Sequence, residues 1–268
     1  MARRAVKSRL SAPFLRRLAL VPERMAPGGY PFDLPILQQG RLEIAFEKRV
    51  TILVGENGTG KSTLLEAIAH QSGFNVFGGN RNHGYRPGQG ATVDVAPLSR
   101  ALRLSWLPRM TSGFFLRAES FFEFAAYLDA GGGSFEARQS HGRQSLHALS
   151  HGESFLALFQ ERFGARGIYL LDEPEAALSP SRQLAFIALL KDMEESGDVQ
   201  FIIATHAPML MAYPGAEVLQ IKDGEILAVD YRDTDHYRLM RRFLEDPAQY
   251  LAHLLDSRRH EAERPARS

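Results

Sequence analysis

The sequence predicts an α/β fold: a mostly parallel β-sheet covered by helices, with an antiparallel β portion and a short helical insertion. Three observations support this prediction. Short apolar segments suited to buried strands alternate with longer segments suited to helices. A glycine-rich loop, residues 55–60, connects one such strand to a helix. A second apolar strand ends at the acidic pair Asp172-Glu173. Alternating strands and helices of this kind are typical of parallel sheets.

Composition narrows the class of protein. The chain has 268 residues, of which 44% are hydrophobic and 24% charged, which is ordinary for a globular protein. The formal net charge of +1 does not indicate a polyanionic partner. The absence of cysteine excludes disulfides, thiol catalysis and cysteine-ligated metals, and it agrees with a reducing compartment. No apolar run is long enough to span a membrane, so we expect no membrane insertion and a cytoplasmic location.

The chain divides into three predicted parts. Residues 1–20 hold six basic residues and no acid, which predicts a basic, solvated N-terminal arm. The alternative is an arm that contacts nucleic acid or an acidic surface. The main domain is expected over residues 21–235, with an insertion over about 73–148. A C-terminal helix and tail are expected over 236–268.

The first half of the chain supplies two clear strands and one clear helix. An alternating strand over 42–46 precedes a strand over 50–54 that is apolar on both faces, and a helix follows from Lys61. The remaining expectations are a loop over 73–92, extended segments over 102–107 and 113–116, and a helix over 120–128.

The second half has a more regular pattern. Four apolar residues, 168–171, form the strand before the acidic pair, and 201–204 form the next. Asp223-Gly224 is a typical two-residue hairpin turn. The other expected elements are helices over 152–163, 180–195 and 236–257, and hairpin strands over 218–221 and 225–229.

The loop between the 50–54 strand and its helix has the spacing of a phosphate-binding P-loop. Its residues are Gly55, Glu56, Asn57, Gly58, Thr59, Gly60, Lys61 and Ser62, with Thr63 directly after. Glycines let successive backbone N–H groups face one phosphate, and the helix N-terminus adds its dipole. Lys61 is expected to contact the β- and γ-phosphates, and the Ser62 hydroxyl to ligate Mg²⁺.

Two further strands end in residues suited to hydrolysis. Asp172 is placed to hold Mg²⁺, directly or through water, and Glu173 to polarise an attacking water. His206 follows the 201–204 strand, where its imidazole can bond a γ-phosphate. Because the carboxyl ends of parallel strands meet at one edge of a sheet, these side chains are expected near the P-loop.

The segment Leu149-Ser150-His151-Gly152-Glu153 has two roles consistent with its sequence. Ser150 and Glu153 form a capping box for the following helix. The same hydroxyl and glycine at a helix N-terminus also make an anion site.

Taken together, these motifs resemble the ABC-type ATPases, and specifically their soluble branch, which includes RecF- and SMC-like proteins. The P-loop 55–62 is similar to Walker A, and 168–173 to Walker B with its catalytic glutamate. Leu149–Glu153 is similar to the signature motif, with His151 in place of its first glycine. His206 is similar to the switch histidine, and 175–180 to the D-loop. The resemblance covers roughly residues 30–230.

The resemblance implies ATP and Mg²⁺ as ligands and a homodimer that forms on ATP binding. Two copies would enclose two nucleotides, with Ser150, Gly152 and Glu153 of one copy acting on ATP held at Lys61 of the other. Hydrolysis by Glu173 would then separate the copies.

Two positions implied by the family are less distinct. We expect Glu119 at the position of the family's Q-loop residue, as a further metal ligand, and Gln89 is the alternative. The adenine-stacking residue is expected upstream of the P-loop, at Tyr30 or Phe32. Both aromatic residues are equally consistent with packing.

The sequence leaves three functions to weigh. The favoured one is a soluble ATPase that couples its nucleotide state to a conformational or partner-binding change, with roles such as DNA repair or defence. The first alternative is the nucleotide-binding subunit of a membrane transporter. The second is an ATP-gated DNA clamp, though without the coiled-coil arms of SMC proteins, because heptads are absent between the P-loop and the signature.

Overall fold

The structure, a computed structural model, describes residues 10–81, 94–121, 123–124, 126, 151–162, 165–252 and 255. Ser150, Gln89 and much of the predicted 73–148 insertion lie outside these residues. The helix expected over 120–128 is helical at the positions described, from Phe121 to Ala126.

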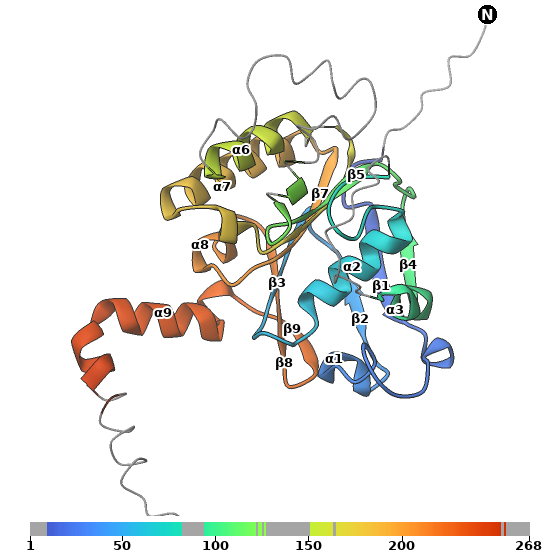
Figure 1. The fold of residues 1–268 in the computed structure, drawn as a ribbon, viewed down its shortest axis with the longest axis horizontal. Helices are drawn as coiled ribbons and strands as arrows, with labels where there is room; N and C mark the ends of the chain where they lie inside the picture. Colours follow the sequence, from blue (N-terminus) through green and yellow to red (C-terminus); the bar gives the residue numbers. More distant parts are fainter. Residues whose placement is uncertain are drawn as a thin grey trace, which may run out of the picture.

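A six-stranded sheet forms the centre of the molecule (Figure 1). Its strand order is β5 (Gly113–Arg117), β6 (Gly167–Asp172), β7 (Val199–Ala204), β3 (Val50–Val54), β8 (Glu217–Lys222) and β9 (Glu225–Ala228). The pairs β5–β6, β6–β7, β3–β7 and β3–β8 are parallel, and β8–β9 is antiparallel. This arrangement confirms the predicted α/β class.

The strands β3, β6 and β7 are buried at every residue, as their apolar sequences predict. Asp223 and Gly224, which join β8 to β9, both have positive φ. The predicted Asp-Gly hairpin turn is therefore confirmed.

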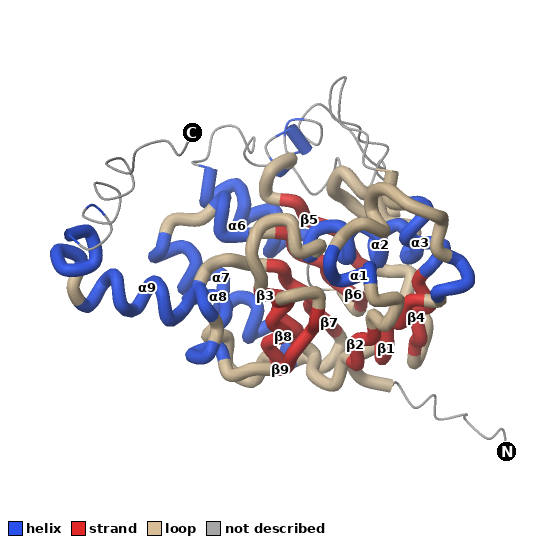
Figure 2. The backbone as a smooth tube through the Cα atoms, turned by 90° about the horizontal axis from the view of Figure 1, so that it is seen from below, coloured by secondary structure: helices blue, strands red, loops and turns tan. Residues whose placement is uncertain are grey.

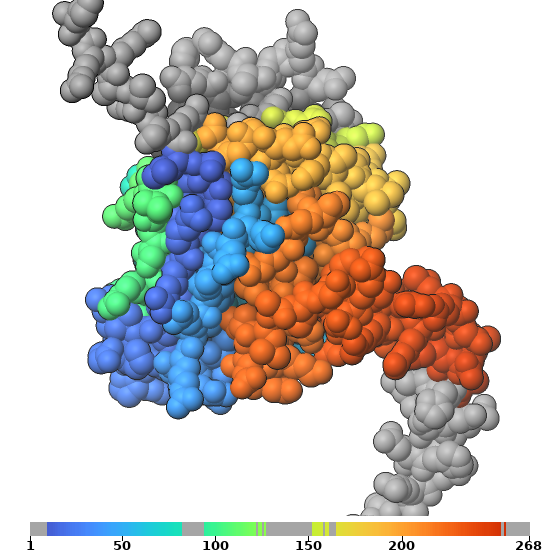
Figure 3. Space-filling model, turned by 180° about the vertical axis from the view of Figure 1, so that it is seen from behind, coloured from blue at the N-terminus to red at the C-terminus, as the bar shows by residue number. Residues whose placement is uncertain are grey.

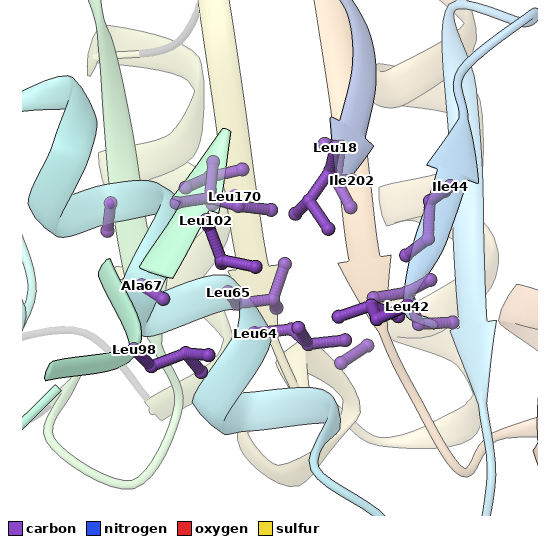
Figure 4. Packing of buried hydrophobic residues seen from close by; sticks show 14 of the residues in the cluster. Leu18, Leu42, Ile44, Leu64, Leu65, Ala67, Leu98, Leu102, Leu170 and Ile202 are labelled. Atoms are coloured by element: carbon purple, nitrogen blue, oxygen red, sulfur yellow. The ribbon is translucent and has the colours of Figure 1, made fainter. Parts of the chain in front are cut away.

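One face of the sheet packs against α2 (Lys61–Ser72), α3 (Ala96–Ala101) and a small antiparallel sheet. Figure 4 shows Leu64 and Leu65 of α2 between the two sheets. The residues they meet there include Leu18, Leu42, Ile44, Leu170 and Ile202. Burying such a helix fixes the direction in which its N-terminus, and hence the P-loop, points.

The opposite face packs against α6 (His151–Arg162), α7 (Pro180–Glu195) and α8 (Pro208–Met211). Aromatic rings dominate this contact. Phe155 and Phe159 of α6 meet Phe186 of α7 edge to face, with ring centroids 5.6 and 4.7 Å apart. This layer fixes the helix that carries the signature-like residues against the sheet.

The small antiparallel sheet corrects the prediction for the N-terminus. It has the order β2 (Glu43–Ala45), β1 (Leu15–Leu20) and β4 (Leu102–Trp106). β1 is its central strand, so the folded part begins well before residue 21, where the basic arm was expected to end. A register shift between Leu15 and Arg17 breaks the apolar alternation that would have revealed this strand.

The C-terminal helix α9 (Asp235–Glu245) extends away from the sheet (Figures 1 and 2). Figure 3, a view from behind, shows it projecting at one side of the molecule. Leu239, Met240 and Leu244 on it are exposed. The single helix expected over 236–257 is wrong in one respect: it is interrupted at Asp246, because the residue before a proline is driven out of helical conformation.

Short helical segments complete the described chain: η1 (Pro22–Arg24), α1 (Pro35–Gln38), η3 (Pro174–Ala177) and η4 (Tyr231–Asp233). Within the described ranges, no helix is both long and apolar enough to cross a membrane.

Gln200 ties the two sheets together and provides a test of the fold. Its fully buried side chain accepts hydrogen bonds from the N–H groups of Phe14 and Leu15 and donates one to the Leu15 carbonyl. Gln200→Leu leaves these buried groups unpaired, so the free energy of unfolding should fall by about 1–3 kcal/mol in urea titration. Gln38→Leu, at an exposed glutamine, is the control and should change it by under about 0.5 kcal/mol. Equal stability of the two variants would contradict this role.

Candidate functional site

The loop between β3 and α2 needs glycine at three positions. A Cβ on Gly55 would lie 2.7 Å from the Ile221 carbonyl oxygen. Gly58 and Gly60 have φ of 80° and 101°, a region that disfavours L-residues with side chains. The Thr59 side chain closes the turn by donating to the Glu56 carbonyl at 2.8 Å. The result is a compact backbone turn at the N-terminus of α2, which suits a phosphate.

Lys61 lies folded back over this loop. Its Nζ donates to the carbonyl oxygens of Gly55 and Glu56 at 2.7 and 3.1 Å. Burial lowers the pKa of Lys61, while the nearby carboxylates of Glu173 and Asp172 oppose that shift. The ammonium therefore lies at the mouth of the loop and is hydrogen-bonded to two of its carbonyl groups.

Ser62 and Asp172 join the loop to the end of β6. The Ser62 hydroxyl donates to Asp172 Oδ1 at 2.9 Å. Burial raises the pKa of Asp172 to about 6, although Arg117 and Ser62 act to lower it. Two oxygen ligands of the type preferred by Mg²⁺ are thus adjacent.

Arg117, at the end of β5, is a cation that sequence reasoning did not assign. Its Nη1 lies 2.6 Å from Glu66 Oε1, and its Nε lies 3.8 Å from Asp172 Oδ2. The predicted ligand Glu119 is 84% exposed and pairs with Arg117 Nη2 at 3.2 Å. Arg117, rather than Glu119, is therefore the contact between this strand end and Asp172.

Glu173 and His206 face each other at the ends of β6 and β7. His206 Nε2 lies 3.4 Å from Glu173 Oε1. Glu173 has φ of 49°, a left-handed conformation that is uncommon outside glycine, and its N–H donates to the Ala204 carbonyl at 2.9 Å. This turn directs the half-exposed carboxylate away from the strand and towards His206.

Glu175 fixes the backbone beside the histidine. Its Oε1 accepts the His206 N–H at 2.6 Å, while its Oε2 is buried without a partner in the described structure. Burial raises the pKa of Glu175, and the hydrogen bond from His206 opposes this. Sequence analysis noted Glu175 only as part of the D-loop pattern.

His236, in the first turn of α9, is a further residue that the sequence did not reveal. Its Nε2 lies 2.9 Å from His206 Nδ1 and 3.8 Å from Glu56 Oε1. No motif links residues 206 and 236, so only the folded arrangement shows their contact.

The two candidates for adenine stacking differ in exposure. Tyr30 is 55% exposed, and its hydroxyl lies 3.0 Å from that of Thr63 in α2. Phe32 is buried among the core side chains under α2. An aromatic face open to a ligand is therefore available at Tyr30 and not at Phe32.

The signature-like residues lie at the start of α6, against α7. Arg182 Nη2 bonds Glu153 Oε1 at 3.0 Å. A Cβ on Gly152 would lie 2.4 Å from Arg182 Cδ, so the glycine permits this close packing. Ser150 is outside the described residues, and its predicted role stays a prediction.

An apolar groove of about 760 Å³ adjoins the site. It lies between α7, α8 and α9, and Glu175 and His206 contribute to its wall together with Tyr237, Met240 and Leu244. The start of α9 thus borders both this groove and the residues around His206.

Comparisons with known proteins identify the family of this chain. Residues 35–82 match the family described as "AAA domain", and residues 117–212 match "AAA domain, putative AbiEii toxin, Type IV TA system". The thiamine import ATP-binding protein ThiQ of Ruegeria sp. is 30% identical over 195 residues, which cover 65% of this chain and 78% of ThiQ. This chain belongs to the ABC-type ATP-binding proteins, which are P-loop ATPases.

Other ABC-type relatives are more distant. The molybdenum import ATP-binding protein ModC of Rhizobium johnstonii is 25% identical, over 70% of this chain and 56% of ModC. The chain thus spans little more than half the length of that relative. A putative metal-chelate type ABC transporter structure has 20% identity and a TM-score of 0.43, covering 72% of this chain and 76% of its own. The SMC head domain from Thermotoga maritima has 19% identity and a TM-score of 0.42, with coverages of 81% and 99%.

The buried carboxylates of this ABC-type ATPase predict a dependence of stability on pH. Burial raises the pKa of Glu66 to about 7 and that of Asp172 to about 6. In the unfolded chain both carboxyl groups have pKa values of about 4. At any pH between those values and the raised pKa values of the folded protein, the folded state binds more protons than the unfolded state. The free energy of unfolding of the nucleotide-free protein should therefore fall as pH rises from 5 to 8.

The variant Glu66→Gln separates this effect from other titrations. The amide does not titrate, so only one of the two carboxyl groups with a raised pKa remains. The free energy of unfolding, measured by urea titration at pH 5, 6, 7 and 8, should therefore decline less steeply with pH than in the wild type. An identical decline in both proteins would contradict the assignment to Glu66.

Proposed function

We propose that this ABC-type ATPase binds ATP with Mg²⁺ and hydrolyses it at a site completed by a second copy of the chain. The observation that carries the proposal is the convergence of three strand ends on the P-loop. Ser62 and Asp172 are hydrogen-bonded at 2.9 Å, and Glu173 and His206 lie 3.4 Å apart. Two oxygens suited to a metal ion, from Ser62 and Asp172, and the carboxylate–imidazole pair of Glu173 and His206 thus lie beside the P-loop.

The residues present fit a magnesium ion. One hydroxyl and one buried carboxylate are hard oxygen donors, and Mg²⁺ takes its remaining ligands from phosphates and water. Among the described residues no group of three His, Cys, Asp or Glu side chains is arranged for a metal. When bound, Mg²⁺ would neutralise charge on the β- and γ-phosphates. Ser62 and Asp172 would hold it, and Glu119 remains the predicted further ligand.

The side chains divide the work of hydrolysis. Lys61 would release the carbonyls of Gly55 and Glu56 and bond the phosphates instead, together with the N–H groups of the loop. Glu173 would orient the attacking water and accept its proton. His206 would hold the γ-phosphate through Nε2, which is buried without a hydrogen-bond partner in the described structure.

The composite site rests on the signature-like residues. In the proposed dimer, Ser150 and the Gly152 backbone of one copy approach the γ-phosphate bound at Lys61 of the other, and Glu153 is a further proposed contact to the nucleotide. A helix N-terminus suits this role because its free N–H groups attract an anion. Tyr30 is the proposed adenine-stacking residue, since its exposed ring stands beside the start of α2.

Glu173→Gln tests the hydrolytic assignment. The amide cannot accept the proton of water, so turnover should fall at least ~100-fold while ATP binding persists. Phosphate release measures the first effect, and light scattering with saturating ATP and Mg²⁺ should show a stable dimer.

A monomeric Glu173→Gln protein under these conditions would contradict the composite site. Glu225→Gln is the matched control, because this exposed glutamate in the β8–β9 hairpin lies outside the proposed catalytic groups. It should turn over ATP as the wild type does.

A second candidate function is the nucleotide-binding subunit of a membrane importer. The observation that favours it is that ThiQ and ModC are both import ATP-binding proteins by name. A pull-down from membranes with the Glu173→Gln protein distinguishes this function from that of an ATPase without a membrane partner. Recovery of a multi-span permease would favour the importer.

A further inference from the structure

The two ring nitrogens of His206 face different groups: Nδ1 is hydrogen-bonded to His236, whereas Nε2 faces the Glu173 carboxylate without a hydrogen bond. Nδ1 lies 2.9 Å from His236 Nε2, and Nε2 lies 3.4 Å from Glu173 Oε1. A neutral imidazole carries a proton on only one of its two ring nitrogens, so that nitrogen donates a hydrogen bond and the other accepts one. Which nitrogen donates decides whether His206 can bond an anion.

We infer that His236 is a positioning residue that donates its Nε2–H to Nδ1 of His206 and so fixes His206 in the tautomer with the proton on Nε2. This inference rests on the proposed role of His206 at the γ-phosphate. A neutral histidine with the opposite tautomer would present a lone pair to the phosphate and repel it.

The charges around the two rings agree with this direction of the hydrogen bond. If His206 Nδ1 donated instead, its Nε2 lone pair would face the Glu173 carboxylate at 3.4 Å with no proton between them. The Glu56 carboxylate lies 3.8 Å from His236 Nε2 and attracts a proton there. Lys61, Glu173, Glu56 and His236 are the charged or titratable groups that act on His206, and Glu175 is bound to its backbone.

Burial and the Lys61 ammonium lower the pKa of His206. The ring is therefore neutral at neutral pH, where a tautomer must be selected. A doubly protonated ring, which donates from both nitrogens, would need no such selection.

The start of α9 holds His236 in place. Thr234 is fully buried and caps the helix by accepting the Tyr237 N–H at 3.3 Å. Asp235 bonds Lys222 and Gln220 of β8 at 2.8 and 3.1 Å. The His236 side chain is only 16% exposed as a result. The tautomer of His206 thus depends on where α9 begins.

Three variants test the inference. His236→Leu removes the donor, whereas His236→Gln keeps an N–H donor at a similar reach. His236→Leu should lower kcat about 10- to 100-fold, by analogy with the loss of the outer hydrogen-bond partner of a metal-ligating histidine. KM for ATP should change by less than about threefold, because His206 acts on the γ-phosphate while Lys61 and the loop still bind the nucleotide. His236→Gln should recover most of the lost kcat. Leu239→Ala, on an exposed part of α9, is the control and should behave as the wild type.

Nuclear magnetic resonance of ¹⁵N-labelled histidine reads the tautomer directly in the nucleotide-free protein. The wild type should show His206 protonated at Nε2, and His236→Leu should show a mixture. Wild-type His206 protonated at Nδ1 would overturn the inference, even if His236→Leu did not fold. So would an unchanged tautomer and kcat in a folded His236→Leu protein.

His206→Ala separates this inference from the proposed function. If His206→Ala hydrolyses ATP normally, the role of His206 itself fails. If His206→Ala is inactive but His236→Leu is fully active, only the inference about His236 fails.

Discussion

The pairing of β7 with β3 on one side and β6 on the other is the constraint on which the site depends. Leu53 and Asp172 both pair with Ala204, so three strands end at the same level. Backbone hydrogen bonds keep the chain aligned just beyond the strand ends: the Glu173 N–H donates to the Ala204 carbonyl, and the Thr205 N–H donates to the Leu53 carbonyl. The loop after β3, the carboxylates after β6 and the histidine after β7 therefore meet without any long-range side-chain contact being needed to bring them there.

Several ionisable side chains are buried at the carboxyl ends of these strands, where a core with a purely structural role would contain apolar side chains. Asp172, Glu66 and Glu175 are buried carboxylates whose pKa values are raised, and Lys61 is a buried ammonium whose pKa is lowered. Arg117 compensates part of the negative charge. Desolvated groups of this kind cost stability and are typical of functional sites. A bound phosphate and cation would supply the missing partners.

Much of the fold was predictable because the decisive signals are local. The strands β3, β6 and β7 are mostly apolar, and the P-loop and Asp223-Gly224 need glycine at defined positions. β1 was missed because a bulge breaks its alternation and its arginines suggested a solvated arm. At the site, Asp172, Glu173 and His206 lie at or just after strand ends and were predicted from the sequence to lie near the P-loop. Arg117 and His236 were not, because their contacts join residues 30 or more positions apart.

In the proposed dimer, Lys61 of one copy and Ser150 of the other belong to one site. Mixing two inactive variants, Lys61→Ala and Ser150→Ala, tests this sharing. In a mixed dimer, one site would combine both changes, while the other would keep an intact P-loop and an intact serine. The mixture should therefore hydrolyse ATP although neither variant does so alone. A mixture as inactive as its components, with mixed dimers shown to form, would contradict it.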